Sequence, residues 1–204
     1  MGANASWRTA VLLANKEIRP HDLLWISEPR DFRAKAELPA WASPEWLSVA
    51  PVVVRREAVS ANDIVPVGIR GRTRGERFAA FITSERKSRR ITPEALFRAG
   101  ARREQTAVAR LLCMRALAQI APELDQLQLA WGVIGSVGFT LASGVSTLRQ
   151  DSDLGLLLRD ARPLPRTEAY ALLWLLRTAP ARIDMQVDTG YGGFALACIG
   201  PSAA

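Results

Sequence analysis

The stretch Gly135-Ser136-Val137-Gly138-Phe139 decides the predicted fold, because it marks a turn between a strand and a helix. The apolar run at residues 129–134 predicts a buried strand before the turn, and residues 139–142 continue as a short helix after it. Backbone N–H groups at the start of a helix lack partners within the helix and lie at the positive end of its dipole. The Gly-Ser turn is therefore a candidate site for a phosphate group.

A second strand is predicted directly after Ser152-Asp153, at residues 154–158. Side chains alternate between the two faces of a strand, so an Asp-x-Asp pair here would direct both carboxylates to one face. Such a face can hold Mg²⁺ against the phosphates of a substrate. The second position of the pair is Gly155, which supplies no ligand. The pattern indicates a metal site in which one carboxylate is missing.

The composition predicts a folded, soluble and cytoplasmic protein. The chain has 204 residues, 49% of them hydrophobic, which suits one large or two small domains with a packed core. No apolar run reaches the roughly 20 residues of a membrane helix, and no cleaved signal is recognisable, so we expect no membrane association. The two cysteines, Cys113 and Cys198, argue against a disulfide framework or a cysteine metal cluster.

Arginine supplies almost all of the positive charge, since lysine occurs only at positions 16, 35 and 87 in a chain of net charge +7. A guanidinium matches phosphate oxygens bidentately, and a basic surface attracts acidic partners. A polyphosphate substrate and an acidic protein would both fit, although the base composition of the gene would equally explain the arginines. We expect no nucleic-acid partner, because the basic residues are not interleaved with aromatic residues.

Two domains are predicted, a small mostly β N-terminal domain at residues 1–83 and a larger domain at residues 84–204. Between their folded parts, the arginine-rich residues 84–90 predict a solvated basic linker. The strand candidates of the first domain are the β-branched runs at residues 51–56, 63–71 and 78–82.

Helices and strands alternate in the second domain. Thr92-Pro93-Glu94 predicts a helix start, with Thr as the cap and Pro at the first helical position. The apolar positions that follow predict a helix pair, or one long helix broken near Gly100, with a stop at Ala121-Pro122. The remaining candidates are a helix at residues 167–177 and strands at residues 182–188 and 192–197.

The order of strand, Gly-Ser turn, helix, strand, helix and strand resembles a nucleotidyltransferase core. The predicted fold class is therefore α/β (α+β), a nucleotidyltransferase-like core preceded by a small mostly β domain. Further stretches extend the likeness over residues 19–196: Pro20-His21-Asp22-Leu23-Leu24, Pro66-Val67-Gly68-Ile69-Arg70-Gly71, Ile183-Asp184-Met185-Gln186-Val187 and Gly192-Gly193-Phe194-Ala195-Leu196. With these, the chain resembles the phosphoribosyl-dephospho-CoA transferases that prime malonate decarboxylase, also called malonate decarboxylase holo-acyl-carrier-protein synthases.

The resemblance implies an enzyme of the nucleotidyltransferase type with Mg²⁺ as its cofactor. Its substrate would be 2′-(5″-triphosphoribosyl)-3′-dephospho-CoA, its partner the apo acyl carrier protein subunit of malonate decarboxylase, whose serine is modified, and its second product pyrophosphate. Asp153 matches the first metal-binding aspartate, and Gly135 with Ser136 matches the phosphate-binding turn. Asp184 lies on the strand where nucleotidyltransferases often place a third carboxylate.

Glycine at position 155, where the family pattern has its second aspartate, leaves three interpretations open. Asp151 could supply the missing ligand if the strand began earlier in the chain. Asp153 and Asp184 could hold one metal ion with lower activity. The chain could also be a catalytically impaired member that binds the carrier protein or the nucleotide without transfer.

Two other features leave more than one interpretation open. The arginines at positions 70–77 either contact phosphates, with Arg70 and Arg72 as the candidates, or bind an acidic carrier protein, or form a solvated hairpin face. His21, the single histidine, could be a general base beside Asp22, but its place after Pro20 favours a structural role in a turn.

Overall fold

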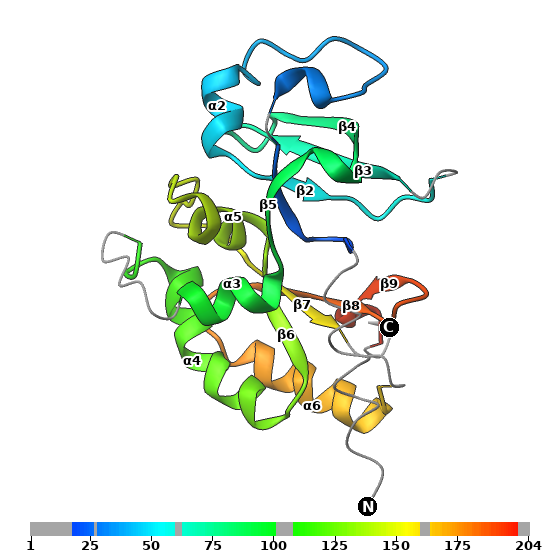
Figure 1. Ribbon diagram of the computed structural model, residues 1–204. Coiled ribbons are helices and arrows are strands. Elements are labelled where there is room, and N and C mark those ends of the chain that lie inside the picture. Colours follow the sequence, from blue (N-terminus) through cyan, green and yellow to red (C-terminus); the bar gives the residue numbers. More distant parts are fainter. Residues whose placement is uncertain (1–17, 27, 60–62, 101–107, 160–163, 200–204) are drawn as a thin grey trace, which may run out of the picture.

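The computed structural model describes residues 18–26, 28–59, 63–100, 108–159 and 164–199 (Figure 1). Within these ranges the protein is mixed α/β, with two sheets and five α-helices. In the view of Figure 1 one sheet lies above the other, and β5 (Lys87–Ile91) runs from the first toward the second. None of the described helices is long and apolar enough to cross a membrane.

The first sheet is antiparallel, with the strand order β4-β3-β2-β1-β5. The predicted strands at residues 51–56, 63–71 and 78–82 are confirmed to within two residues. Fully buried side chains of this sheet, such as Leu24 and Ile82, form a core of their own. Besides β5, its strands are β1 (Leu23–Ile26), β2 (Val52–Val54), β3 (Ile64–Arg70) and β4 (Arg77–Thr83).

The predicted solvated linker at residues 84–90 is wrong, because this segment forms the 3-10 turn η2 (Ser84–Arg86) and strand β5. β5 pairs antiparallel with β1 and forms an edge of the first sheet. The Arg89 guanidinium carbon lies 4.3 Å from the centre of the Trp25 ring. Ser88 Oγ donates to the Trp25 carbonyl oxygen. Long basic side chains can cover apolar surface while their heads stay in water, and charges on an edge strand discourage pairing with other chains.

Helix α2 (Pro44–Val49) was missed in the sequence. Ser43 caps it, since Ser43 Oγ accepts the N–H of Trp46, and Pro44 occupies the first helical position. The signal was therefore present as Ser-Pro-Glu followed by Trp46 and Leu47, which are both buried. A six-residue helix is too short for its apolar period to stand out.

The second sheet has the order β6-β7-β8-β9. β6 (Ala130–Ile134) is antiparallel to β7 (Leu154–Arg159), β7 is parallel to β8 (Ile183–Asp188), and β8 is antiparallel to β9 (Gly193–Ala195). These strands confirm the sequence predictions, except that the predicted last strand at residues 192–197 ends early, where the 3-10 turn η3 (Leu196–Ile199) begins.

Helices α4 (Leu112–Gln126) and α6 (Arg166–Arg177) supply the main apolar core with the second sheet. Leu154, Leu156 and Leu158 of β7 are fully buried in the same cluster as side chains of both helices. α3 (Pro93–Gly100) is separate from α4. Of the two predicted arrangements, the structure therefore confirms the helix pair and not a single long helix with a break. α5 (Gly135–Ser143) follows β6 directly.

The predicted helix stop at Ala121-Pro122 is wrong, because α4 continues through Pro122 to Gln126. Proline removes one helical hydrogen bond and crowds the preceding turn. Leu124, beyond the proline, is 1% exposed within the main core, and Ile120 before it is fully buried. Burial of the same helix face on both sides of Pro122 holds the helix together, which local propensity does not reveal.

Strand register sets the geometry of the candidate site. Gly155 pairs with Ile134 of β6 on one side and with Asp184 of β8 on the other. The Gly-Ser turn that follows Ile134 therefore lies beside the start of β7. The predicted division into residues 1–83 and 84–204 stays a prediction, and the first sheet itself extends to Ile91.

Candidate active site

The Gly-Ser turn begins helix α5 as the sequence indicated. Gly135 adopts a left-handed backbone with φ of 68°, which glycine reaches without steric cost. Ser136 follows within the first turn of the helix and is half-buried. The first N–H groups of α5 have no helical partners, so this end of the helix is suited to an anion.

Arg70 comes from the first sheet and contacts this turn. Its Nη2 donates to Ser136 Oγ at 2.6 Å, and only 8% of the residue is exposed. Trp46 Nε1 donates to the Arg70 carbonyl oxygen at 2.7 Å, which fixes the backbone at the end of β3. The structure therefore brings together two predicted phosphate-binding residues that lie 66 positions apart in the chain.

An aromatic pair lies beneath the arginines. The rings of Trp46 in α2 and Phe139 in α5 stack with centroids 6.2 Å apart. The guanidinium of Arg72 lies over Trp46 at 4.6 Å, and that of Arg70 lies over Phe139 at 5.4 Å. Such cation–π contacts orient a guanidinium without neutralising it.

An open pocket lies at this junction, with about 390 Å³ of empty space that includes open solvent. Four guanidinium groups line it, against the single carboxylate of Asp151. Burial, followed by the charges of Arg77 and Arg74, lowers the pKa of Arg70 to about 10, so Arg70 remains charged at neutral pH. The pocket has the chemistry of an anion site. Its lining consists of Arg70, Arg72, Arg74, Ser136, Thr147, Arg149, Asp151 and Ser152.

The three predicted carboxylates occupy different places. Asp151 lines the pocket from the turn at residues 149–152, which is closed by the Ser152 N–H donating to the Arg149 carbonyl oxygen. Asp153 lies next to the strand start, 3.6 Å from Arg74. Asp184 is exposed on β8, in register with Gly155. β7 begins at Leu154, so Asp151 lies in a turn and is not on the strand.

These positions bear on whether the site fits Mg²⁺. Across the described ranges, no group of three or more His, Cys, Asp or Glu side chains is placed to hold a metal ion. Asp153 precedes Gly155 by two residues and Asp184 is its strand neighbour, so two carboxylates flank the glycine. Magnesium in phosphate-transfer sites commonly uses one or two carboxylates together with substrate phosphates. The donor set therefore fits a metal ion that arrives with phosphates, and it does not form an all-protein cage.

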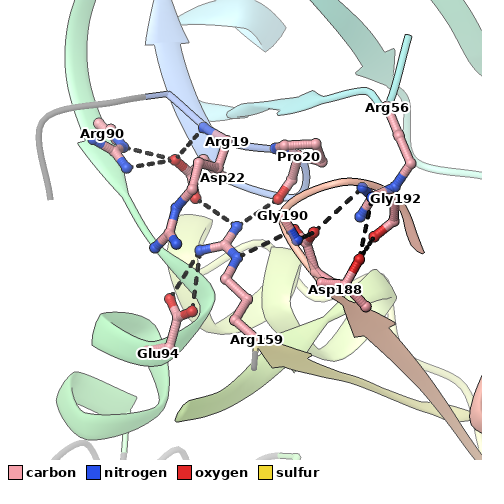
Figure 2. A network of polar contacts seen from close by, with 11 residues as sticks. Arg19, Pro20, Asp22, Arg56, Arg90, Glu94, Arg159, Asp188, Gly190 and Gly192 are labelled. Carbon is pink, nitrogen blue, oxygen red and sulfur yellow. Dashed lines mark hydrogen bonds and ion pairs between the residues drawn. The ribbon is translucent and has the colours of Figure 1, made fainter. Parts of the chain in front are cut away.

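A buried ionic network at the other end of β7 from Gly155 was missed by sequence reasoning (Figure 2). Arg159, at the end of β7, contacts Asp22 and Glu94 at 3.0 Å each. Its Nε lies 3.7 Å from Asp188, its register partner on β8. Asp22, which is fully buried, also accepts from Arg90 at 2.7 Å. Charged residues at the ends of apolar strands were the available signal, but their pairing depends on tertiary structure.

Asp188 belongs to this network, and the predicted turn residue His21 lies close enough to feel its charges. Burial raises the pKa of Asp188, but the Gly190 N–H, Arg56 and Arg159 lower it more, so the net pKa is below its ordinary value. His21 has a left-handed backbone with φ of 71°, and its N–H donates to the Val54 carbonyl oxygen at 2.8 Å. The structural role favoured for His21 agrees with this geometry.

Comparison with known proteins gives two family matches that together span most of the chain. Residues 19–93 match the phosphoribosyl-dephospho-CoA transferase MdcG N-terminal domain, and residues 100–199 match its C-terminal domain. No solved structure matches the chain.

Curated relatives named phosphoribosyl-dephospho-CoA transferase give the same result. The protein from Pseudomonas aeruginosa is 44% identical over 177 residues, which cover 87% of this chain and 81% of the relative. The one from Azotobacter vinelandii is 43% identical over 182 residues, 87% of this chain and 82% of the relative. The one from Pseudomonas fluorescens is 42% identical over 176 residues, which cover 86% of this chain and 81% of the relative. The chain therefore belongs to the phosphoribosyl-dephospho-CoA transferase family.

Proposed function

We propose that this protein attaches 2′-(5″-triphosphoribosyl)-3′-dephospho-CoA to a serine of the apo acyl carrier protein subunit of malonate decarboxylase and releases pyrophosphate. The reaction is a nucleotidyl transfer on a nucleotidyltransferase-like core. Family membership supports the dephospho-CoA part of the proposal. The observation that carries it is the arginine-lined pocket at the start of α5, where Arg70 meets Ser136.

In this reaction the serine hydroxyl of the carrier attacks the phosphorus attached to ribose. The new P–O bond forms as the bond to the pyrophosphate oxygen breaks, and the hydroxyl proton passes to solvent or a carboxylate. Negative charge grows on the departing pyrophosphate, so fixed cations and N–H groups beside it stabilise the transition state. The N-terminus of α5 and the arginines of the pocket take this role in our proposal.

We assign Mg²⁺ to Asp153 and Asp184, where it would neutralise phosphate charge when bound together with the substrate. In this assignment Asp151, which lines the arginine pocket, is the remaining candidate ligand. The serine nucleophile belongs to the carrier protein, so the protein itself needs no Ser-His-Asp arrangement.

The test is transfer to apo acyl carrier protein with the triphosphoribosyl substrate and Mg²⁺, followed by intact mass and pyrophosphate release. We expect the full prosthetic-group mass on the carrier, loss of transfer in EDTA, and a fall of about 100-fold or more for Asp153→Asn. Thermal unfolding of Asp153→Asn should match that of the parent protein. Unchanged turnover of this variant would remove Asp153 from the active site.

Gly155 supports one alternative, a catalytically impaired member that binds the carrier or the nucleotide without transfer. A Gly155→Asp variant decides between the two. A Cβ at position 155 would lie 3.2 Å from Ile134 Cγ1 and from the Ile134 carbonyl oxygen, so Ile134 must shift by a few tenths of an ångström. Transfer by the parent protein supports the enzyme. Transfer by Gly155→Asp alone identifies an impaired member, and transfer by neither, with the carrier still bound, favours a binding protein.

A further inference from the structure

The pocket and the buried network at the other end of β7 differ in charge balance. In the network, three carboxylates face three guanidinium groups. They are those of Asp22, Glu94, Asp188, Arg56, Arg90 and Arg159. The pocket instead combines four guanidinium groups with Asp151, and the nearby Asp153 contacts Arg74. An excess of two positive charges therefore remains in the pocket after both carboxylates are counted.

Arg70 shows that this excess is built into the fold. Only 8% of the residue is exposed, and among the described residues it forms no ion pair. Its partners are the Ser136 hydroxyl and the face of Phe139, neither of which carries a negative charge. A buried cation without a counter-charge destabilises a protein. Its place at the N-terminus of α5 suits an anionic ligand that supplies the missing charge.

We propose that this pocket binds a pyrophosphate group directly through guanidinium and hydroxyl groups, with no metal ion in the contact. The identity of the anion as a pyrophosphate rests on the proposed function, whereas its negative charge follows from the pocket alone. The pocket holds the leaving group, and the carboxylates that flank Gly155 face the other part of the substrate triphosphate.

Two linked phosphate groups suit the pocket better than one. Donors approach from two separate segments, since Arg70, Arg72 and Arg74 come from the β3–β4 hairpin while Thr147, Arg149 and Ser152 come from the loop after α5. A guanidinium prefers two oxygens of one phosphate at a time. Two linked phosphate groups can meet the guanidinium groups of both segments at the same time, one phosphate on each side, with Ser136 between them in the lining.

The same charges explain why no metal ion is needed for this contact. A divalent cation in the pocket would meet the repulsion of four guanidinium groups. The Asp153 carboxylate on the pocket side already lies 3.6 Å from Arg74. The arginines provide the positive charge that a second metal ion would otherwise bring to the leaving group.

Calorimetric titration with pyrophosphate tests the proposal, once in EDTA and once in excess Mg²⁺. We expect binding in EDTA and affinity for inorganic phosphate at least about tenfold weaker, because fewer charge-assisted hydrogen bonds form. Arg149→Gln should weaken pyrophosphate binding about tenfold or more. Arg177→Gln, an exposed change of equal charge on α6, should leave it unchanged.

Binding only in the presence of Mg²⁺ would overturn the proposal, and so would equal affinity for phosphate and pyrophosphate. Equal losses in Arg149→Gln and Arg177→Gln would also overturn it, since they would indicate attraction by net charge alone. The experiment contains neither carrier protein nor nucleotide. Pyrophosphate binding without transfer would therefore count against the proposed function only, and transfer without pyrophosphate binding in EDTA would count against the pocket only.

Discussion

Arg70 and Arg159 are both buried arginines, but they are buried for different reasons. Arg159 contacts three carboxylates, whereas Arg70 contacts a hydroxyl group and an aromatic ring. Replacing a buried charge by an apolar side chain of similar length has opposite effects in these two settings. It removes a desolvation cost where the charge is unpaired, and it leaves other charges unpaired where the charge belongs to a network.

The first prediction concerns Arg70→Met. We expect the free energy of unfolding to stay the same or rise by about 1 kcal/mol, because an unpaired buried cation is removed. Pyrophosphate binding should fall at least about tenfold in the same variant. Urea unfolding and calorimetry on one preparation check both effects. A loss of stability of more than about 1 kcal/mol would show that Arg70 serves the fold and not a ligand.

The second prediction concerns the pH dependence of stability through His21. Burial, then Arg56 and Arg159, lowers the pKa of His21, while Asp188 and a hydrogen bond with Gln186 raise it by less. The unfolded ring titrates near pH 6.5, so below that pH the unfolded chain binds a proton that the folded protein does not. The free energy of unfolding therefore falls as pH decreases from about 6.5 toward the lower folded pKa.

The measurement is urea unfolding at several pH values between about 7.5 and 5.5, for the parent protein and for His21→Asn. Asparagine tolerates the left-handed backbone at position 21 and does not titrate. We expect the variant to lose most of this pH dependence. Asp188 affects a different window, because the stability from a lowered carboxylate pKa is present above about pH 4 and is lost only below it. An identical slope in both proteins would contradict the assignment to His21.

At the scale of the element, sequence pattern was most informative where a segment buries one clear face. Strands β3, β7 and β8 follow their apolar patterns closely. The exceptions are β5, where basic side chains lie on a sheet edge, and α4, where tertiary burial outweighs a proline. In both segments the deciding contacts come from residues far away in the chain, which local pattern cannot show.

The third prediction follows from Pro122 in the interior of α4. The proline is exposed, so its ring contributes little packing, while it lacks the N–H of a regular helix. Pro122→Ala should raise the free energy of unfolding by about 1–2 kcal/mol, less than the full helix cost of proline because the unfolded chain becomes more flexible. Urea unfolding measures the change. A destabilised variant would mean that the helix is shaped around the proline.

At the scale of the whole molecule, the candidate site is formed where segments from both sheets meet. The sequence identified Gly135, Ser136 and Arg70 as separate candidates, and the structure joins Arg70 to Ser136. It did not reveal Arg149 or Thr147 as pocket residues, because the segment that follows α5 has no regular pattern. The metal assignment of Asp151, Asp153 and Asp184 stays a prediction, since the described carboxylates do not gather as a group of three.

The fourth prediction concerns the network that joins the two sheets. Arg159→Met leaves Asp22 and Asp188 buried without their central cation, so we expect a loss of about 3–5 kcal/mol in the free energy of unfolding. Arg74→Met is the control for stability, since Arg74 pairs with Asp153 at 3.6 Å and the two side chains are 73% and 39% exposed. The control should lose less than about 1 kcal/mol. Similar losses in the two variants would show that the network does not link the halves.

The wide sequence separation within this network has a consequence for synthesis on the ribosome. Asp22 and Arg159 are 137 positions apart, so the carboxylate leaves the exit tunnel long before its main cation has been translated. Domains tend to fold in order from the N-terminus as the chain emerges. Through β5, Arg90 is the described residue of the first sheet whose side chain pairs with its buried aspartate. Translation of β7 then supplies Arg159, so a chain that ends before residue 159 lacks the Arg159–Asp22 ion pair that joins the two sheets.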